Sequence, residues 1–201
     1  MVEPSITYYD RNAAKLVPRY DRLTFEDVHH GLLPYLPNPP AAILDVGAGS
    51  GRDAIALAHR GYLVTAVEPA KSMLRHGCER SADLAIEWIN DRLPSLVSLQ
   101  DRKASFDLIL CSAVLMHIPP ARLDLAIETM RGLLRPTGRL AVSVRTQAAN
   151  DEPGLFNDHG AATIIGSADK AGLTLVRSFA DEDRLGRAEL IWNNFLFARE
   201  A

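Results

Sequence analysis

A chain of 201 residues is long enough for one domain with a well-developed hydrophobic core. Its net charge of −3 and the absence of any run of basic residues exclude the electrostatic footprint of a nucleic-acid-binding protein. The longest apolar stretch, LILCSAVLMHI, is too short to cross a bilayer, so we expect a soluble protein without a membrane partner.

Residues 1–40 come before the first strand pattern and end in the breaker LPNPP. We expect them to form an N-terminal helical cap, and residues 41–201 to form the ligand-binding domain. The N-terminus has no apolar signal core. Cys78 and Cys111 do not form a C-x-x-C pair and are interpreted as reduced core thiols, which favours a cytoplasmic protein.

From residue 41 onward, apolar strand patterns alternate with helical patterns. Strands are predicted at 41–47, 62–68, 84–89, 105–112 and 138–145. Helices are predicted at 52–60, at 70–80, from the prolines at 119–120 to a stop at Pro136 and Gly138, and at 161–172. This alternation is typical of an α/β protein with a doubly wound parallel sheet. The last two strands, at 173–179 and 188–198, are joined by a short loop, which favours an antiparallel hairpin at one edge.

The stretch LDVGAGSGRD, at residues 44–53, places three glycines at the end of the first predicted strand. In open parallel sheets the ligand lies at the carboxyl ends of the strands, and glycine lets the backbone approach it closely. The spacing of Gly47, Gly49 and Gly51 departs from the dinucleotide fingerprint G-x-G-x-x-G, and Asp45 precedes it. Because a carboxylate repels a pyrophosphate and attracts an ammonium, this loop favours the amino-acid end of S-adenosylmethionine as its ligand.

Polar side chains also follow the next three predicted strands. Glu68 ends the second strand, where an acid binds ribose hydroxyls in doubly wound folds. Asn90 and Asp91 end the third strand and can accept the amino group of adenine. Ser112 ends the fourth and faces the methionine part. A strand-end acid is often only a helix cap, and Asp91 can serve as one, but four successive strand ends together indicate a cofactor site.

Five stretches in order resemble the motifs of class I S-adenosylmethionine-dependent methyltransferases. They are LDVGAGSGRDA, VTAVEP, WINDRLPSL, FDLILCSAVLMHIPP and LLRPTGRLAVSVR. The similarity runs from about residue 5 to the end of the chain. It implies a Rossmann-like, doubly wound, seven-stranded and mostly parallel sheet whose last strand is antiparallel. One departure is Thr137, where the family usually has a second glycine.

The resemblance also implies which residues bind the cofactor, and most of them lie in the stretches quoted above. Those around the methionine end and the ribose are Asp45, Gly47, Ala48, Gly49 and Glu68. Those around the adenine are Pro69, Met73 and Asp91.

Two tyrosines near the N-terminus, in YYDRNA, resemble the family segment that closes over the cofactor. We expect Tyr9 to contact the methionine carboxylate or the sulfonium and Tyr8 to face the substrate. An aromatic pair that only packs the helix explains the same two residues.

The implied reaction is an in-line displacement in which an acceptor atom attacks the sulfonium methyl, so alignment carries most of the catalysis. His117, about five residues beyond the fourth strand, is the candidate general base; the alternative is that it packs over the cofactor or orders the loop. Arg145, at the tip of the fifth strand, is a candidate contact for an acidic acceptor, and a surface ion pair is its commoner role. No metal site is expected.

The favoured acceptor is a small molecule, and nucleic acid is disfavoured because no basic stripe is present. The sequence leaves the acceptor, the use of a base and the oligomeric state undetermined. Two alternatives remain: an NAD-dependent oxidoreductase on a similar sheet and a protein that binds S-adenosylmethionine without catalysis. An aminopropyl transferase is disfavoured, because such enzymes need extra acids for a polyamine and no acidic pair follows the fourth predicted strand.

Overall fold

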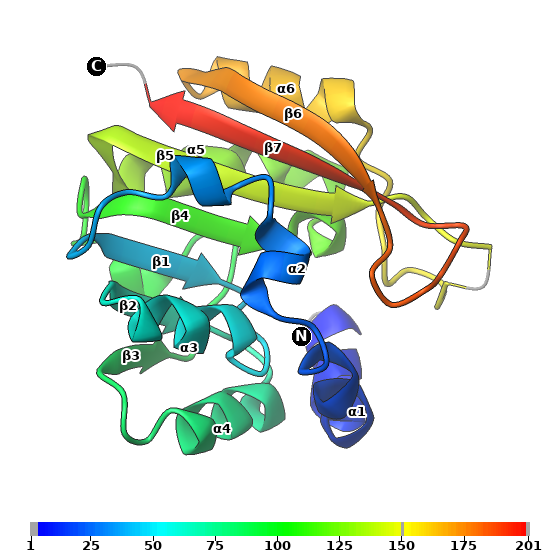
Figure 1. The fold of residues 1–201 in the computed structure, drawn as a ribbon. Helices are drawn as coiled ribbons and strands as arrows, with labels where there is room; N and C mark the ends of the chain where they lie inside the picture. Colours follow the sequence, from blue (N-terminus) through cyan, green and yellow to red (C-terminus); the bar gives the residue numbers. More distant parts are fainter. Residues whose placement is uncertain (1–3, 150, 200–201) are drawn as a thin grey trace.

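The computed structural model describes residues 4–149 and 151–199, which fold with helices on both sides of a sheet (Figure 1). The helices are α1 (Pro4–Tyr20), α2 (Phe25–His29), α3 (Arg52–His59), α4 (Lys71–Arg80), α5 (Leu123–Leu133) and α6 (Ala161–Lys170), with short 3₁₀ turns between some of them. The strands are β1 (Ala42–Val46), β2 (Leu63–Val67), β3 (Ile86–Ile89), β4 (Phe106–Ser112), β5 (Leu134–Arg145), β6 (Leu173–Glu182) and β7 (Ile191–Arg199).

Within the described residues, seven strands form the sheet in the order β3-β2-β1-β4-β5-β7-β6. The ladders from β3 to β5 are parallel, whereas β7 is antiparallel to both β5 and β6. Asp45 of β1 lies beside Ala66 of β2 and Leu110 of β4, so the carboxyl ends of these strands meet at one edge. The predicted doubly wound, mostly parallel sheet with an antiparallel last strand is confirmed.

Alternating apolar side chains cover the two faces of the sheet, as the two-residue period of a strand requires. In β4, Ile109 and Cys111 pack under α5 and α6, whereas Leu108 and Leu110 pack under α2 and α3. Figure 1 shows these two helix layers on opposite sides of the sheet. A central strand buried on both faces explains why β4 is a nearly continuous apolar run.

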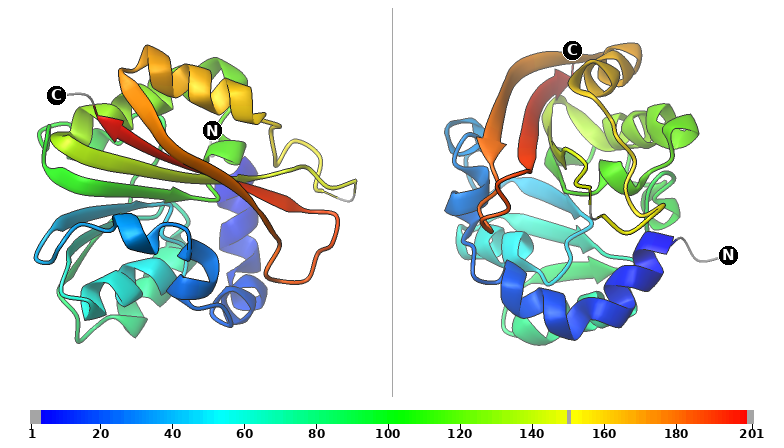
Figure 2. Two further views of the ribbon diagram at one scale, coloured as in Figure 1. Left: turned by 45° about the horizontal axis from the view of Figure 1, so that its top comes forward. Right: turned by 90° about the vertical axis from the view of Figure 1, so that its right-hand side faces the viewer.

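The segment before β1 is helical in its described part, with α1, α2 and a 3₁₀ turn over Leu33–Tyr35. Helix α1 packs against α4 through a cluster that includes Leu16, Val17 and Met73. Figure 2 shows α1 crossing the end of the sheet toward which the parallel strands point. The division into a cap (1–40) and a binding domain (41–201) stays an expectation, and residues 1–3, 150 and 200–201 of these two units lie outside the described residues. No helix in the described ranges is both long and apolar enough to span a membrane.

Three details differ from the sequence predictions. Helix α5 begins at Leu123, after a 3₁₀ turn over Pro120–Arg122. Strand β5 begins at Leu134, because Leu134 pairs with Phe106 before the main ladder with β4 starts. Cys111 is buried as expected, but Cys78 is exposed, because it lies on the solvent side of α4.

Candidate active site

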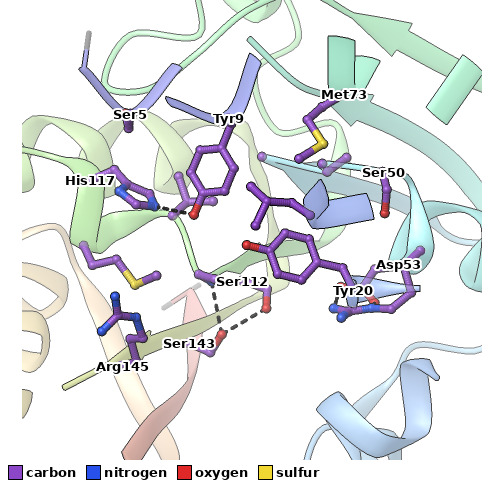
Figure 3. A pocket seen from close by; sticks show the side chains of 18 of the residues that line it. Ser5, Tyr9, Tyr20, Ser50, Asp53, Met73, Ser112, His117, Ser143 and Arg145 are labelled. Atoms are coloured by element: carbon purple, nitrogen blue, oxygen red, sulfur yellow. Dashed lines mark hydrogen bonds and ion pairs between the residues drawn. The ribbon is translucent and has the colours of Figure 1, made fainter. Parts of the chain in front are cut away.

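A cavity of about 400 Å³ opens at the carboxyl edge of the parallel strands. It lies where the strand order reverses between β1 and β4, the usual position for a ligand in a doubly wound sheet. Its wall combines the β1–α3 loop, the ends of β2, β4 and β5, and helix α1 (Figure 3). All the predicted site residues line it except Asn90.

The glycine loop after β1 is held by backbone hydrogen bonds, since the N–H groups of Gly47 and Ala48 both donate to the Val67 carbonyl. Gly47 has φ +71°, and a Cβ there would lie 2.3 Å from Cγ2 of Val114. Gly49 has φ +58°, and a Cβ there would meet no atom within 4 Å. The loop therefore leaves open space at Gly49, next to which a ligand can approach the backbone.

Asp45 carries an unsatisfied acceptor in this wall. Its side chain is 2% exposed, and its Oδ2 atom is buried without a hydrogen-bond partner. Burial raises the pKa of Asp45 well above its usual value, and the neighbouring carboxylate of Asp53 raises it further. A buried carboxyl oxygen without a partner is costly, so a cationic ligand group that donates to it would stabilise the site.

Asp53 is a second buried carboxylate, at the start of α3, and both of its oxygens have hydrogen-bond partners. It accepts from Nε of Arg52 at 2.7 Å and contacts Nε2 of His29 at 2.9 Å. Although burial raises the pKa of Asp53, Arg52 and His29 outweigh it and hold that pKa well below the usual value. Arg52 and His29 therefore compensate the charge of Asp53, and neither makes a hydrogen bond to Oδ2 of Asp45.

Glu68, at the end of β2, faces the other side of the glycine loop. Its two carboxyl oxygens accept from the backbone N–H groups of Gly49 at 2.9 Å and Ala70 at 2.7 Å. Burial raises the pKa of Glu68 to about 7, against the lowering effect of those two hydrogen bonds. Each carboxyl oxygen of Glu68 keeps a second lone pair, so the two oxygens can accept hydrogen bonds from two neighbouring hydroxyl groups, such as those of a ribose.

The residues after β3 behave differently from one another. The Nδ2 of Asn90 donates to the carbonyls of Glu68 and Pro69, so this side chain braces the β2–α4 connection and does not line the cavity. Asp91 lines the cavity, and its oxygens accept from the N–H groups of Arg92 and Ser98, both at 2.7 Å. The capping alternative for Asp91 therefore coexists with its place in the wall.

Ser112 ends β4 and interacts with Ser143 of β5 through their hydroxyl oxygens, 3.0 Å apart. The next residue, Ala113, has φ +60°, which is uncommon for a residue with a Cβ, and its N–H donates to the Ser143 carbonyl. Strain of this kind tends to persist at ligand-binding positions.

His117 lines the cavity together with three aromatic residues, Tyr8, Tyr9 and Phe156. Figure 3 shows His117 next to the hydroxyl of Tyr9. The Nε2 of His117 lies 3.1 Å from the hydroxyl of Tyr9, and its Nδ1 lies 2.9 Å from the Leu155 carbonyl. The ring of Phe156 packs against the imidazole with centroids 5.0 Å apart. Tyr8 packs edge-to-face on Tyr9 at 5.5 Å, so the two tyrosines pack together and also line the cavity.

Arg145 is neither a surface ion pair nor a free cation. It is 7% exposed, and its guanidinium donates to both oxygens of Asp151 at 2.6 and 2.9 Å. The same guanidinium lies 3.9 Å from the ring centroid of Phe156. Because Asp151 neutralises it, Arg145 offers little attraction to an acidic acceptor.

The match to known proteins agrees with this geometry. Residues 43–138 match the profile of the methyltransferase domain family. The ubiquinone biosynthesis O-methyltransferase of Xylella fastidiosa (strain 9a5c) is 37% identical over 123 residues, which are 57% of this chain and 46% of that relative. This profile covers just under half of the chain, and together with the curated relatives it supports a class I S-adenosylmethionine-dependent methyltransferase.

Solved structures with the same fold include two methyltransferases. The magnesium protoporphyrin IX methyltransferase of Synechocystis PCC 6803, with bound S-adenosylmethionine, is 17% identical with a TM-score of 0.71, covering 100% of this chain and 99% of that one. The 1,6-didemethyltoxoflavin-N1-methyltransferase of Burkholderia thailandensis is 22% identical with a TM-score of 0.65, covering 100% and 92%. The matched stretch covers just under half of the length of the curated relatives, including the Xylella protein.

Several residues that line the cavity were not predicted from the sequence. They are Tyr20, Asp53, Ser143 and Phe156. Asp53 directly follows the glycine loop, and Ser143 lies near the end of the predicted fifth strand. Their position at the carboxyl ends of strands is therefore a sequence signal that could have identified both. Tyr20 and Phe156 lie far from any recognisable motif. In the described ranges, no cluster of three or more His, Cys, Asp or Glu side chains suits a metal ion.

Proposed function

We propose that this protein transfers the methyl group of S-adenosylmethionine to a small-molecule acceptor. The observation that carries the proposal is the buried, unpartnered Oδ2 of Asp45 beside an open glycine loop. The ammonium of the cofactor would donate to that atom. Glu68 would accept the ribose hydroxyls, and Met73 and Pro69 would flank the adenine.

The residues suit the cofactor better than a pyrophosphate. The acids Asp45, Asp53 and Glu68 lie around the loop, and the nearby Arg52 is paired with Asp53. A dinucleotide would bring two negative charges into this acidic region, whereas S-adenosylmethionine brings positive charge.

A small uncharged acceptor suits the remainder of the cavity. Tyr8, Tyr9 and Phe156 contribute ring surfaces there, and the charge of Arg145 is matched by Asp151. The Xylella relative is named as an O-methyltransferase, which supports an oxygen atom as the methyl acceptor. The methyl would pass in line from the sulfonium to that oxygen, with the cavity supplying alignment and exclusion of water.

The test is cofactor binding by the Asp45→Asn variant, measured by titration calorimetry with S-adenosylhomocysteine. Losing a hydrogen bond to a charged group costs about 1.5–3 kcal/mol, so we expect affinity to fall roughly 10- to 100-fold. Asp124→Asn is the matched control, because Asp124 lies outside the cavity and pairs with Lys170 on the surface. Wild-type binding of NAD without binding of S-adenosylhomocysteine would overturn the proposal.

Catalysis is tested separately by measuring S-adenosylhomocysteine released with a panel of small acceptors. Release that depends on an acceptor supports methyl transfer. Tight cofactor binding without release from any acceptor would favour the alternative of a binding protein without catalysis.

A further inference from the structure

The hydroxyl of Tyr9 and the imidazole of His117 join two segments that are far apart in sequence. Tyr9 lies on α1, and His117 ends a 3₁₀ turn, Leu115–His117, that follows β4. Their side chains meet at 3.1 Å, and both line the cavity beyond Ser112. Figure 3 shows the hydroxyl ends of Tyr9 and Tyr20 both reaching into this part of the cavity.

The hydrogen bonds of His117 fix which atom carries the proton. The Leu155 carbonyl can only accept, so Nδ1 of His117 donates to it and carries the hydrogen. Burial lowers the pKa of His117, so the ring is neutral near pH 7 and Nε2 is an acceptor. Tyr9 therefore donates its phenolic hydrogen to Nε2.

In this arrangement the methyl acceptor can form a hydrogen bond with Tyr9 but not with Nε2 of His117. The lone pair of Nε2 is occupied by the Tyr9 hydroxyl, so a substrate cannot reach it directly. The oxygen of Tyr9 has two lone pairs; one interacts with the neighbouring hydroxyl of Tyr20, and the other can accept a hydrogen bond from the hydroxyl of the methyl acceptor. Burial, with the neighbouring phenol of Tyr20, raises the pKa of Tyr9 well above its usual value, so it stays protonated and neutral.

The groups around Tyr9 and His117 do not offer another base that could take a proton from the methyl acceptor. Arg145 of β5 faces both side chains, and Asp151 neutralises it. Tyr20 and Tyr8 of α1 and the uncharged ring of Phe156 complete the surroundings. Of the described residues that line the cavity, His117 is the one histidine.

We propose that Tyr9 and His117 form a proton relay that activates a neutral hydroxyl group of the methyl acceptor. The inference rests on the methyl transfer proposed above. The acceptor O–H proton passes to the oxygen of Tyr9 while the Tyr9 proton passes to Nε2 of His117. The acceptor oxygen forms a bond to the methyl carbon, the S–CH₃ bond breaks, and its electron pair stays on sulfur as the thioether. The imidazolium, held by the Leu155 carbonyl, then releases its proton to solvent.

The relay is tested with two probe acceptors that differ in acidity, catechol and 4-nitrocatechol, at slightly alkaline pH. Catechol is protonated there, whereas 4-nitrocatechol is largely ionised and needs no base. Tyr9→Phe should lower kcat for catechol by about 100-fold or more, the usual contribution of a general base, and lower kcat for 4-nitrocatechol only slightly. The hydroxyl of Tyr9 contacts His117 and the variant keeps the ring that is expected to contact the cofactor, so affinity for S-adenosylhomocysteine should fall far less than kcat for catechol.

Two further variants separate the relay from a structural role. His117→Gln should give the same acceptor-dependent loss and should remove the rise of kcat with pH that neutral His117 produces in the wild type. Tyr62→Phe is the matched control, because the Tyr62 hydroxyl donates to the Pro37 carbonyl outside the cavity, and its loss should spare both reactions.

Three outcomes would overturn the relay. Equal losses for the two probes in Tyr9→Phe would mean that Tyr9 positions the cofactor or the acceptor. Cofactor binding without methylation of either probe would mean that the acceptor is not a hydroxyl compound of this class. Absence of cofactor binding would refute the proposed function itself, and with it the relay.

Discussion

The carboxyl group of Glu68 combines a raised pKa with a role that needs its charge. Its pKa moves from the usual 4.5 to about 7 because the group is buried. Its contribution to stability is therefore fully present below pH 4.5 and is lost as the pH rises through about 7, where the buried group ionises. The ionised form is also the one that can accept two ribose hydroxyls.

We therefore expect affinity for S-adenosylhomocysteine to rise as the pH is raised through about 7. Glu68→Gln should weaken binding roughly 10- to 100-fold, because a charged acceptor is lost, and should flatten the pH dependence. Calorimetric titrations between pH 5.5 and 8.5 would measure both effects. Glu87→Gln is a suitable control, since Glu87 pairs with Arg102 away from the cavity. An unchanged pH profile in the Glu68 variant would contradict the assignment.

At the scale of single residues, the sequence best predicted which residues line the cavity when those residues lie at the end of a strand. Asp45, Glu68 and Ser112 lie at the cavity because the carboxyl ends of parallel strands share an edge. Arg145 also lies there, but its pairing with Asp151 changes what it can do. The partner comes from a loop whose course no strand-end argument predicts.

Among the elements, α4 rests on β3 through an unusual contact between Gly77 and Trp88. A Cβ at Gly77 would lie 2.3 Å from Cη2 of Trp88, so glycine makes room for the indole. The indole Nε1 donates to the Ser81 hydroxyl at 2.9 Å, which fixes the ring. The glycine therefore lowers helix propensity in exchange for close packing next to the cofactor region.

Gly77→Ala should destabilise the protein although alanine favours helix by about 1 kcal/mol. Overpacking costs about 1–3 kcal/mol, so after the gain in helix propensity we expect a net loss of up to about 2 kcal/mol in the free energy of urea unfolding. Gly132→Ala in α5 is the matched control, because no atom lies within 4 Å of its added Cβ, and it should be neutral or stabilising. Equal effects at the two glycines would refute the packing explanation.

The boundaries of elements were less predictable than their existence. Pro136 and Gly138 end a helical pattern, yet both lie inside β5, because the pairing of Leu134 with Phe106 begins the strand earlier. A hydrogen bond from Arg199 of β7 to the Leu134 carbonyl adds to this pairing. Pairing between residues far apart in sequence cannot be predicted from the local pattern of apolar residues, prolines and glycines.

At the scale of the whole molecule, the cavity joins segments from α1 to the β6–β7 loop, so a ligand bound there should stabilise the complete fold. S-adenosylhomocysteine at about 100 times its Kd should add about 2.7 kcal/mol. For a protein of this size that corresponds to a rise in Tm of roughly 5–10 °C, measurable by scanning calorimetry. NAD at the same concentration should leave Tm unchanged, and a shift with NAD alone would reverse the choice of cofactor.

The sequence by itself determined the alternation of strands and helices, the antiparallel hairpin, and the acids that follow successive strands. These features depend on local periodicity and on the rule that parallel strands end at one edge. Only the tertiary structure decided that Tyr9 meets His117, that Asp151 neutralises Arg145, and that Asn90 turns away from the cavity. Those contacts join residues from separate loops and helices, and their distances depend on how whole elements pack, which no short stretch of sequence specifies.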